Sequence, residues 1–258
     1  MTASAQALAL SRRSILGTFR QPQAWIPGFL FPLLMAAVYA AQFKRATQLP
    51  GFPEVDSFLQ FLLPATVLQA CIFGATNGAS DLAVDIEQGF FERLLAAPVS
   101  RTSILVGRLS GSAVFAGVQS AVIMAVFFAF GARAEGGIAA MVTIVVVAVL
   151  LATGIGALAS GLALKTGSQE AVQSVFPLLF VLIFISSAFF PTNTMTGWYK
   201  AAAERNPITW IMDPTRHLAI VGWDAGEAAK AVLIAAGFAV FAVVVALFAL
   251  RRRLQESG

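Results

Sequence analysis

A charged segment separates two long apolar runs of this sequence and holds its densest group of ionisable side chains. Within residues 81–109, four carboxylates (Asp81, Asp85, Glu87 and Glu92) stand between apolar stretches. Each would cost roughly 2.5–3.5 kcal/mol at the centre of a helix in hydrocarbon. The segment is therefore expected to lie at a membrane surface.

A short amphipathic helix is predicted inside this charged segment. Its apolar positions recur at helical spacing: Phe90, Phe91, Leu94 and Leu95. Its charged positions fall elsewhere around the turn: Glu87, Glu92 and Arg93. Pro98 is expected to end the helix, since proline lacks an N–H group and disfavours helix for the preceding residue. Such a helix, lying in the interface plane, is expected to form a docking surface for a soluble partner. The alternative is that these charges only keep a surface loop hydrated.

No motif of the sequence supports a catalytic site or a metal site. A Gly-x-x-x-x-Gly-Lys-Ser/Thr motif is absent, so nucleotide binding through a P-loop is not expected. His217 is the only histidine and has no cluster of ligands at metal spacing, which favours a structural role. No Gly-x-Ser-x-Gly nucleophile motif occurs either. We therefore predict that the chain is not an enzyme and binds no metal or cofactor, and that any ATP is hydrolysed elsewhere.

The composition is that of an integral membrane protein. Of 258 residues, 58% are hydrophobic and only 12% are charged, and the mean hydropathy is +0.81. The pI of about 9.7 comes from arginines at the edges of apolar runs, so nucleic-acid binding is not implied. Because the loops are too short to fold alone, one membrane domain over residues 1–258 is expected, with lipid around it.

Six apolar stretches are long enough to cross a hydrocarbon core, which takes about 20 helical residues. The predicted spans are residues 25–42, 58–80, 104–131, 138–164, 171–190 and 231–250. The side holding both termini carries ten Lys and Arg residues and the other side seven. This bias predicts cytoplasmic termini in a multi-pass protein of the cell inner (plasma) membrane.

Two further segments are predicted to be helical without spanning. Residues 4–20 interleave apolar residues with arginines, which is typical of a basic amphipathic helix on an anionic leaflet, a disordered tail being the alternative. Residues 192–221 are too polar to span and too aromatic for a solvated loop, so two short helices that enter the outer leaflet part-way are expected. The residues expected to close the outer end of the pathway are Pro191, Trp198, Asn206, Pro207, Trp210, Asp213 and Arg216.

Two runs of the sequence resemble a known transporter family. Residues 87–101, followed by Gly107-Arg108, look like the signature of the type-2 permeases of ATP-binding-cassette exporters, in particular the daunorubicin-resistance-like branch. The run from Pro177 to Pro191 is similar to that family's segment between its last two spans, together with Trp198, Asn206, Pro207, Asp213 and Arg216.

The resemblance implies a fold and an assembly. It implies an all-α protein of six spans, an N-terminal interfacial helix, a cytoplasmic coupling helix at about 87–97 and an outer re-entrant hairpin. Two permeases, as identical copies or paralogues, would join two nucleotide-binding ATPase subunits. The ATPase contact is carried over onto Glu87, Phe90, Phe91, Glu92, Arg93, Leu94, Pro98 and Arg101.

The implied function is ATP-driven export of a hydrophobic drug, a lipid or another amphiphile. A lipid-linked glycan is the alternative substrate. A proton-driven secondary transporter is disfavoured, because it would place a carboxylate within a span, whereas the acidic residues here map to interfaces and loops. We expect the apolar residues of the coupling helix to pack towards the spans and its charges to pair with the ATPase.

Overall fold

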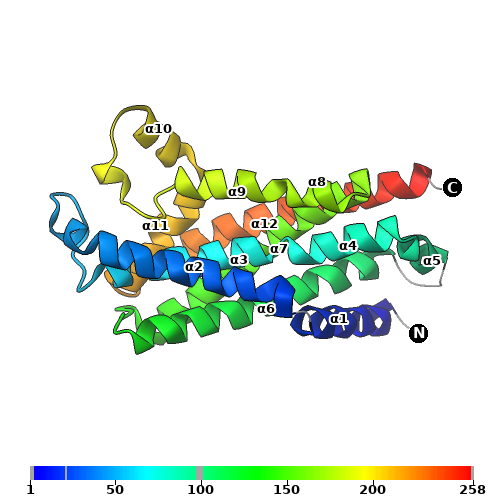
Figure 1. The fold of residues 1–258 in the computed structure, drawn as a ribbon, viewed down its shortest axis with the longest axis horizontal. Coiled ribbons are helices and arrows are strands. Elements are labelled where there is room, and N and C mark those ends of the chain that lie inside the picture. Colours follow the sequence, from blue (N-terminus) through cyan, green and yellow to red (C-terminus); the bar gives the residue numbers. More distant parts are fainter. Residues whose placement is uncertain (1–2, 21, 97–100, 257–258) are drawn as a thin grey trace.

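In the computed structural model, every regular element of the described residues (3–20, 22–96 and 101–256) is a helix. The long helices run roughly along one axis (Figure 1). One end of the molecule, the α5 end, carries α5 (Phe90–Ala96) and both termini. The opposite end, the α10 end, carries α10 (Gly197–Arg205) and α11 (Pro207–Ile220). Both termini therefore lie at the same end of the molecule as the predicted docking helix, as expected from the sequence.

Within the described residues, the elements that run between the two ends are α2 (Pro22–Gln42), α3 with α4 (Phe58–Gly74, Asn77–Glu87), α6 (Arg101–Ala129), α7 (Gly137–Thr166), α8 with α9 (Gln169–Gln173, Val175–Phe184) and α12 (Ala225–Glu256). Two 3₁₀ helices, η1 (Lys44–Gln48) and η2 (Thr192–Thr194), lie in loops. Five of these passes are long and apolar enough to cross a membrane. The segment Gln169–Phe184 is shorter. The chain is therefore an all-α, multi-pass membrane protein, and the predicted span at 171–190 is present only as this shorter helix pair.

Local chemistry explains where several helices begin and end. The Ser57 side chain caps α3 by accepting a hydrogen bond from Gln60 N at 3.2 Å. Gly167 ends α7 with a φ of +65°, a conformation that glycine adopts without steric cost. Pro177 cannot donate to the carbonyl of Gln173, and α8 is separated from α9 at this point.

Helix α3 lies at the centre of the bundle. Other helices surround it, so its side chains are buried all around the helix. Those with no exposed surface include Phe61, Leu62, Leu63, Val67 and Leu68. The outer helices α2 and α12 instead show large apolar side chains on their surface, among them Leu30, Leu34, Leu233, Val240 and Phe241. An apolar surface of this kind is stable against lipid tails.

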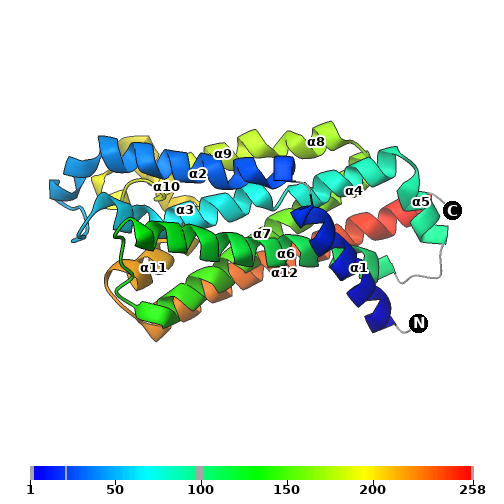
Figure 2. The same ribbon diagram turned by 60° about the horizontal axis from the view of Figure 1, so that its bottom comes forward.

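Helix α1 (Ala3–Phe19) packs along α6 and then leaves the bundle obliquely at the α5 end, as Figure 2 shows. A Cβ atom added to Gly107 of α6 would lie 2.6 Å from the Cβ of Leu10, so glycine permits this close approach. Ser14 Oγ also donates to the carbonyl of Arg108 at 3.4 Å. The amphipathic helix expected at residues 4–20 is present, and its contact with an anionic leaflet stays a prediction.

Candidate functional site

The docking helix predicted at the α5 end starts later than expected. Helix α4 ends at Glu87, and Gly89 turns the chain with a φ of +68° before α5 begins at Phe90. Glycine reaches this left-handed conformation at little cost. The predicted helix over residues 87–97 is therefore wrong at its start, because Glu87 belongs to α4. Pro98 lies outside the described residues, and so does the side chain of Arg101.

The apolar residues of α5 hold it against the bundle. Phe91 is 1% exposed and shares a core cluster with Leu82 of α4 and Ile104 of α6, against which Leu94 also packs. Phe90 contacts α1 instead, where the guanidinium carbon of Arg13 lies 4.7 Å from its ring centroid. The predicted packing of this face towards the long helices is confirmed for Phe91 and Leu94.

Two of the charges assigned to the partner contact are engaged within the chain. Glu92 Oε1 accepts a hydrogen bond from Arg253 Nη2 at 3.3 Å, and Glu87 Oε1 accepts one from the backbone N–H of Gln169 at 2.8 Å. Glu92 nonetheless remains 51% exposed. Arg93 is exposed and has no ion pair within the described residues. It is thus the most available charge on α5.

Arg253 joins three helices at the α5 end. Its Nη1 donates to the carbonyl of Leu164 near the end of α7 at 2.9 Å, while its Nη2 pairs with Glu92 of α5. Its guanidinium carbon also lies 5.8 Å from the ring centroid of Phe91. Arg253 follows Arg251 and Arg252 at the end of the last predicted span, and nothing in this local pattern points to a distant partner.

A second ion pair joins α4 to α6. Arg108 pairs with Asp85, and their side chains are only 17% and 20% exposed. A buried cation is costly unless it is paired, and Asp85 supplies the pairing charge.

At the α10 end, a buried arginine holds α11 against the turn that follows α9. Arg216 Nη2 donates to the carbonyls of Ser187 at 2.7 Å and Ala188 at 2.9 Å. Its guanidinium carbon lies 4.0 Å from the ring centroid of Phe61, and its Nη1 lies 3.5 Å from Asp213 Oδ1. Burial lowers the pKa of Arg216 to about 10, so the group still carries its charge at pH 7.

Other side chains of the same hairpin donate hydrogen bonds to the backbone carbonyls at the end of α9. Asn206 Nδ2 donates to the carbonyl of Leu182 at 2.7 Å and Tyr199 Oη donates to that of Phe184 at 2.5 Å. Asp213 accepts from Ser187 Oγ at 2.5 Å. The last carbonyls of a helix have no intrahelical donor, so these bonds fix the hairpin to α9.

The structure brings together only part of the predicted outer gate. Asn206, Asp213 and Arg216 converge on the end of α9, with Pro207 as the first residue of α11 and Pro191 buried nearby. Trp198 and Trp210 are 76% and 49% exposed and stay on the surface. Sequence reasoning missed Ser187 and Tyr199, which carry no distinguishing local pattern. The gating role of this hairpin stays a prediction.

A cavity of about 650 Å³ lies between α2, the α3–α4 junction, α6 and α8–α9. Its walls are aromatic, and the ring centroids of Phe73 and Phe176 are 4.6 Å apart while Phe73 stacks on Phe180. Asn77 and Ser80 of α4 add polar groups. An apolar pocket with a few polar groups is typical of sites that bind small amphiphilic molecules.

A buried glutamine shapes one wall of this cavity. Pro32 has no N–H group, so the carbonyl of Gly28 loses its donor within α2. Gln119 of α6, which has no exposed surface, donates its Nε2 to that carbonyl at 2.9 Å. The bond fixes α2 to α6 one turn before Pro32 and beside Phe115, which lines the cavity.

Apolar helices of spanning length, a surface helix fixed at one end and an aromatic cavity in the bundle together define a membrane permease. The sequence pattern of the ABC-2 type transporter family matches residues 5–220, so the chain belongs to this family.

Curated relatives agree with this membership. The chain is 26% identical over 218 residues to the daunorubicin resistance ABC transporter permease protein DrrB1 of Streptomyces coeruleorubidus, covering 83% of this chain and 76% of the relative. It is 31% identical over 214 residues to the putative transport permease ycf38 of Cyanophora paradoxa, covering 81% and 72%. It is 29% identical over 167 residues to the probable doxorubicin resistance ABC transporter permease protein DrrC of Mycobacterium tuberculosis, covering 65% and 60%.

Proposed function

We propose that this chain is the transmembrane subunit of an exporter that moves a hydrophobic drug, a lipid or another amphiphile out of the cytoplasm or inner leaflet. The observation that carries the proposal is the aromatic cavity of about 650 Å³. Stacked rings such as Phe73 and Phe180 suit planar or aliphatic apolar groups. The lining favours such substrates over the glycan of a lipid-linked oligosaccharide.

The energy would come from a separate ATPase subunit that binds ATP and Mg²⁺ and docks at the α5 end. In this arrangement the α5 end faces the cytoplasm. The names of the relatives, permease proteins of ABC transporters, support this division of labour. On the permease side, Arg93 and the exposed carboxylate of Glu92 would form the rim of the contact. Two copies or paralogues of the chain would assemble with two ATPases.

Helix α4 offers a direct path from the ATPase contact to the cavity. Its first residue, Asn77, lines the cavity, and its last residue, Glu87, lies next to the Gly89 turn that leads into α5. The helix would be about 16 Å long and would move as one unit. Ala75 and Thr76, between α3 and α4, keep right-handed helical dihedral angles, so the two helices continue in one direction with only a local interruption. We infer that α4 tilts relative to α3 at this interruption. A displacement of α5 would thereby change the cavity.

The proposal is tested by purifying the tagged chain from its own cells in a mild detergent and identifying the co-purified proteins by mass spectrometry. We expect an ATPase subunit, with ATP hydrolysis by the complex and none by the chain alone. Arg93→Glu should weaken this association more at low salt than at high salt, since exposed charges act at long range. Arg12→Glu on α1 is a matched control. ATP hydrolysis by the purified chain without a partner would contradict the proposal.

A further inference from the structure

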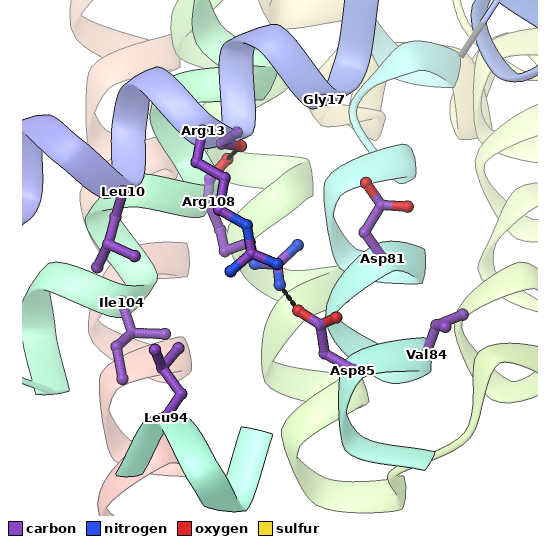
Figure 3. A pocket seen from close by; sticks show the side chains of 11 residues that line it. Leu10, Arg13, Gly17, Asp81, Val84, Asp85, Leu94, Ile104 and Arg108 are labelled. Carbon is purple, nitrogen blue, oxygen red and sulfur yellow. Dashed lines mark hydrogen bonds and ion pairs between the residues drawn. The ribbon is translucent and has the colours of Figure 1, made fainter. Parts of the chain in front are cut away.

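A second, polar cavity lies at the α5 end between α1, α4, α5 and α6 (Figure 3). Its volume is about 260 Å³. Charged side chains and apolar side chains such as Leu10 and Leu94 line it together. It shares no lining residue with the aromatic cavity.

The charges of this polar cavity are separated by sign. Arg13 of α1 and Arg108 of α6 extend from one side, and their guanidinium groups lie beside each other, whereas Asp81 and Asp85 extend from α4 on the other (Figure 3). Arg108 is paired with Asp85. Arg13 and Asp81 line the same cavity, and neither has an ion pair within the described residues. Asp81 also interacts electrostatically with Arg108, and Arg13 lies over the Phe90 ring, but the carboxylate and the guanidinium both keep hydrogen-bonding capacity for a ligand.

The cavity lies at the depth of lipid headgroups. At 1.5 Å per residue, the helical stretch 58–80 is about 34 Å long, slightly more than the hydrocarbon core of about 30 Å. Asp81 is the next residue and so lies at the polar boundary. On α6, the stretch from Arg108 to Ala129 is also about 32 Å long. Two independent helices therefore place this cavity at the same surface.

We propose that this cavity binds the headgroup of a phospholipid that carries both a phosphate and a primary ammonium group, as phosphatidylethanolamine does. Arg13 binds the phosphate, because a guanidinium presents paired N–H donors that match phosphate oxygens. Asp81 accepts hydrogen bonds from the ammonium, which a quaternary choline cannot donate. Leu10 and Leu94 contact the glycerol and the first methylenes.

The bound lipid would fasten α1 to α4 beside the docking helix. Arg13 already contacts Phe90 of α5, so the lipid, α1 and α5 form one unit at this end. The lipid is a structural ligand here, and its binding depends neither on nucleotide nor on the proposed export function.

The test is native mass spectrometry of the full chain, purified in detergent and titrated with phosphatidylethanolamine, phosphatidylcholine or phosphatidylglycerol of identical acyl chains. We expect phosphatidylethanolamine to bind about tenfold more tightly than the other two, the effect of one charge-assisted hydrogen bond. Arg13→Gln and Asp81→Asn should each remove this preference. Arg12→Gln changes a neighbouring exposed arginine that does not line the cavity and should keep it.

Three outcomes would overturn the proposal. The first is equal binding of the three lipids by the parental chain. The second is an unchanged preference in both Arg13→Gln and Asp81→Asn, and the third is an equal loss in Arg12→Gln. A further experiment adds soluble phosphoethanolamine to the chain with bound phosphatidylethanolamine. Displacement of the lipid by an equal concentration of phosphoethanolamine would assign the site to a free phosphate ester and contradict a lipid ligand. Because Arg13 is an exposed residue, its variant reports on the site even where Asp81→Asn does not fold.

Discussion

Arg253 and Glu92 are separated by 161 positions in the sequence, yet Arg253 Nη2 lies 3.3 Å from Glu92 Oε1. The pair joins the last helix of the chain to the helix proposed to contact the ATPase. With Glu92 half-exposed, the pair is worth at most about 1 kcal/mol of stability. Its role is therefore to orient α5 rather than to hold the fold together.

The first prediction exchanges the two charges. Glu92→Lys places two cations together and should uncouple ATP hydrolysis from transport while leaving the unfolding midpoint almost unchanged, because the pair is partly solvated. The double variant Glu92→Arg with Arg253→Glu restores opposite charges and should recover coupling. The measurement is the ratio of ATP hydrolysed to substrate moved in proteoliposomes. A double variant as uncoupled as Glu92→Lys would contradict a coupling role of the Glu92–Arg253 pair and would leave the proposed contact of Glu92 with the ATPase as the cause.

The second prediction concerns the buried arginine at the α10 end. Arg216→Met removes the donors to the carbonyls of Ser187 and Ala188, so the free energy of unfolding should fall by about 2–4 kcal/mol, to which the half-exposed Asp213 adds little. Arg205→Met is the control, since Arg205 is exposed and donates only within its own helix. Thermal unfolding in detergent measures both, and equal small effects would contradict the structural role of Arg216.

The pH dependence of the Arg216 contribution has a defined sign. Burial lowers the pKa of Arg216 from its usual value to about 10, so below pH 9 the group is protonated in both the folded and the unfolded chain. The difference in unfolding free energy between the parental chain and Arg216→Met should then stay constant from pH 6 to 9. Above pH 10 the folded chain releases the proton first, which relieves the burial penalty of the cation. A difference that varies between pH 6 and 9 would contradict this.

The third prediction concerns the turn before α5. Gly89→Ala should cost about 1–2 kcal/mol, because alanine is strained at a φ of +68° even though nothing lies within 4 Å of the added Cβ. Gly17→Ala on α1 also meets open space, but within a helix, and should stabilise by up to about 1 kcal/mol. Unfolding in denaturant compares the two variants. Equal effects would show that Gly89 does not need its left-handed conformation.

The fourth prediction is a double-mutant cycle at Pro32 of α2 and Gln119 of α6. Gln119→Leu should cost about 1 kcal/mol, since it leaves the carbonyl of Gly28 without a donor. In the Pro32→Ala background, the new backbone N–H can donate to that carbonyl, so the same change should cost less. Equal costs in the two backgrounds, measured by thermal unfolding, would show that Gln119 does not compensate for Pro32.

The sequence predicts the long helices well because hydrophobic length is a local signal. The helices α6 and α7 begin and end within a few residues of the predicted spans, and α12 contains its predicted span and extends beyond it. The breaks are harder to predict. Nothing in the local pattern at Ala75–Thr76 distinguishes it from the helix around it, and at Gly89 only the backbone conformation shows that the chain turns.

The sequence predicts the kind of site, a surface helix for docking, but not the contacts that hold it in place. Charge and spacing identify α5 as a surface helix, but the partners of Glu92 and Arg108 lie on other helices, and a single sequence carries no signal for such pairs. The same holds for Arg216, which the sequence suggests is an interfacial charge and the fold buries against Phe61. The aromatic cavity likewise forms from four separate segments.

The most direct measurement of the central claim is ATP-driven uptake of a fluorescent hydrophobic amphiphile by proteoliposomes that contain this chain and its co-purified ATPase. We predict uptake that requires ATP and falls about tenfold or more in the double variant Phe73→Ala with Phe180→Ala, because both rings line the cavity. Phe241→Ala, an outward-facing ring of α12, should transport at the parental rate. Uptake without ATP, or equal uptake by the cavity variant and the parental chain, would contradict the account.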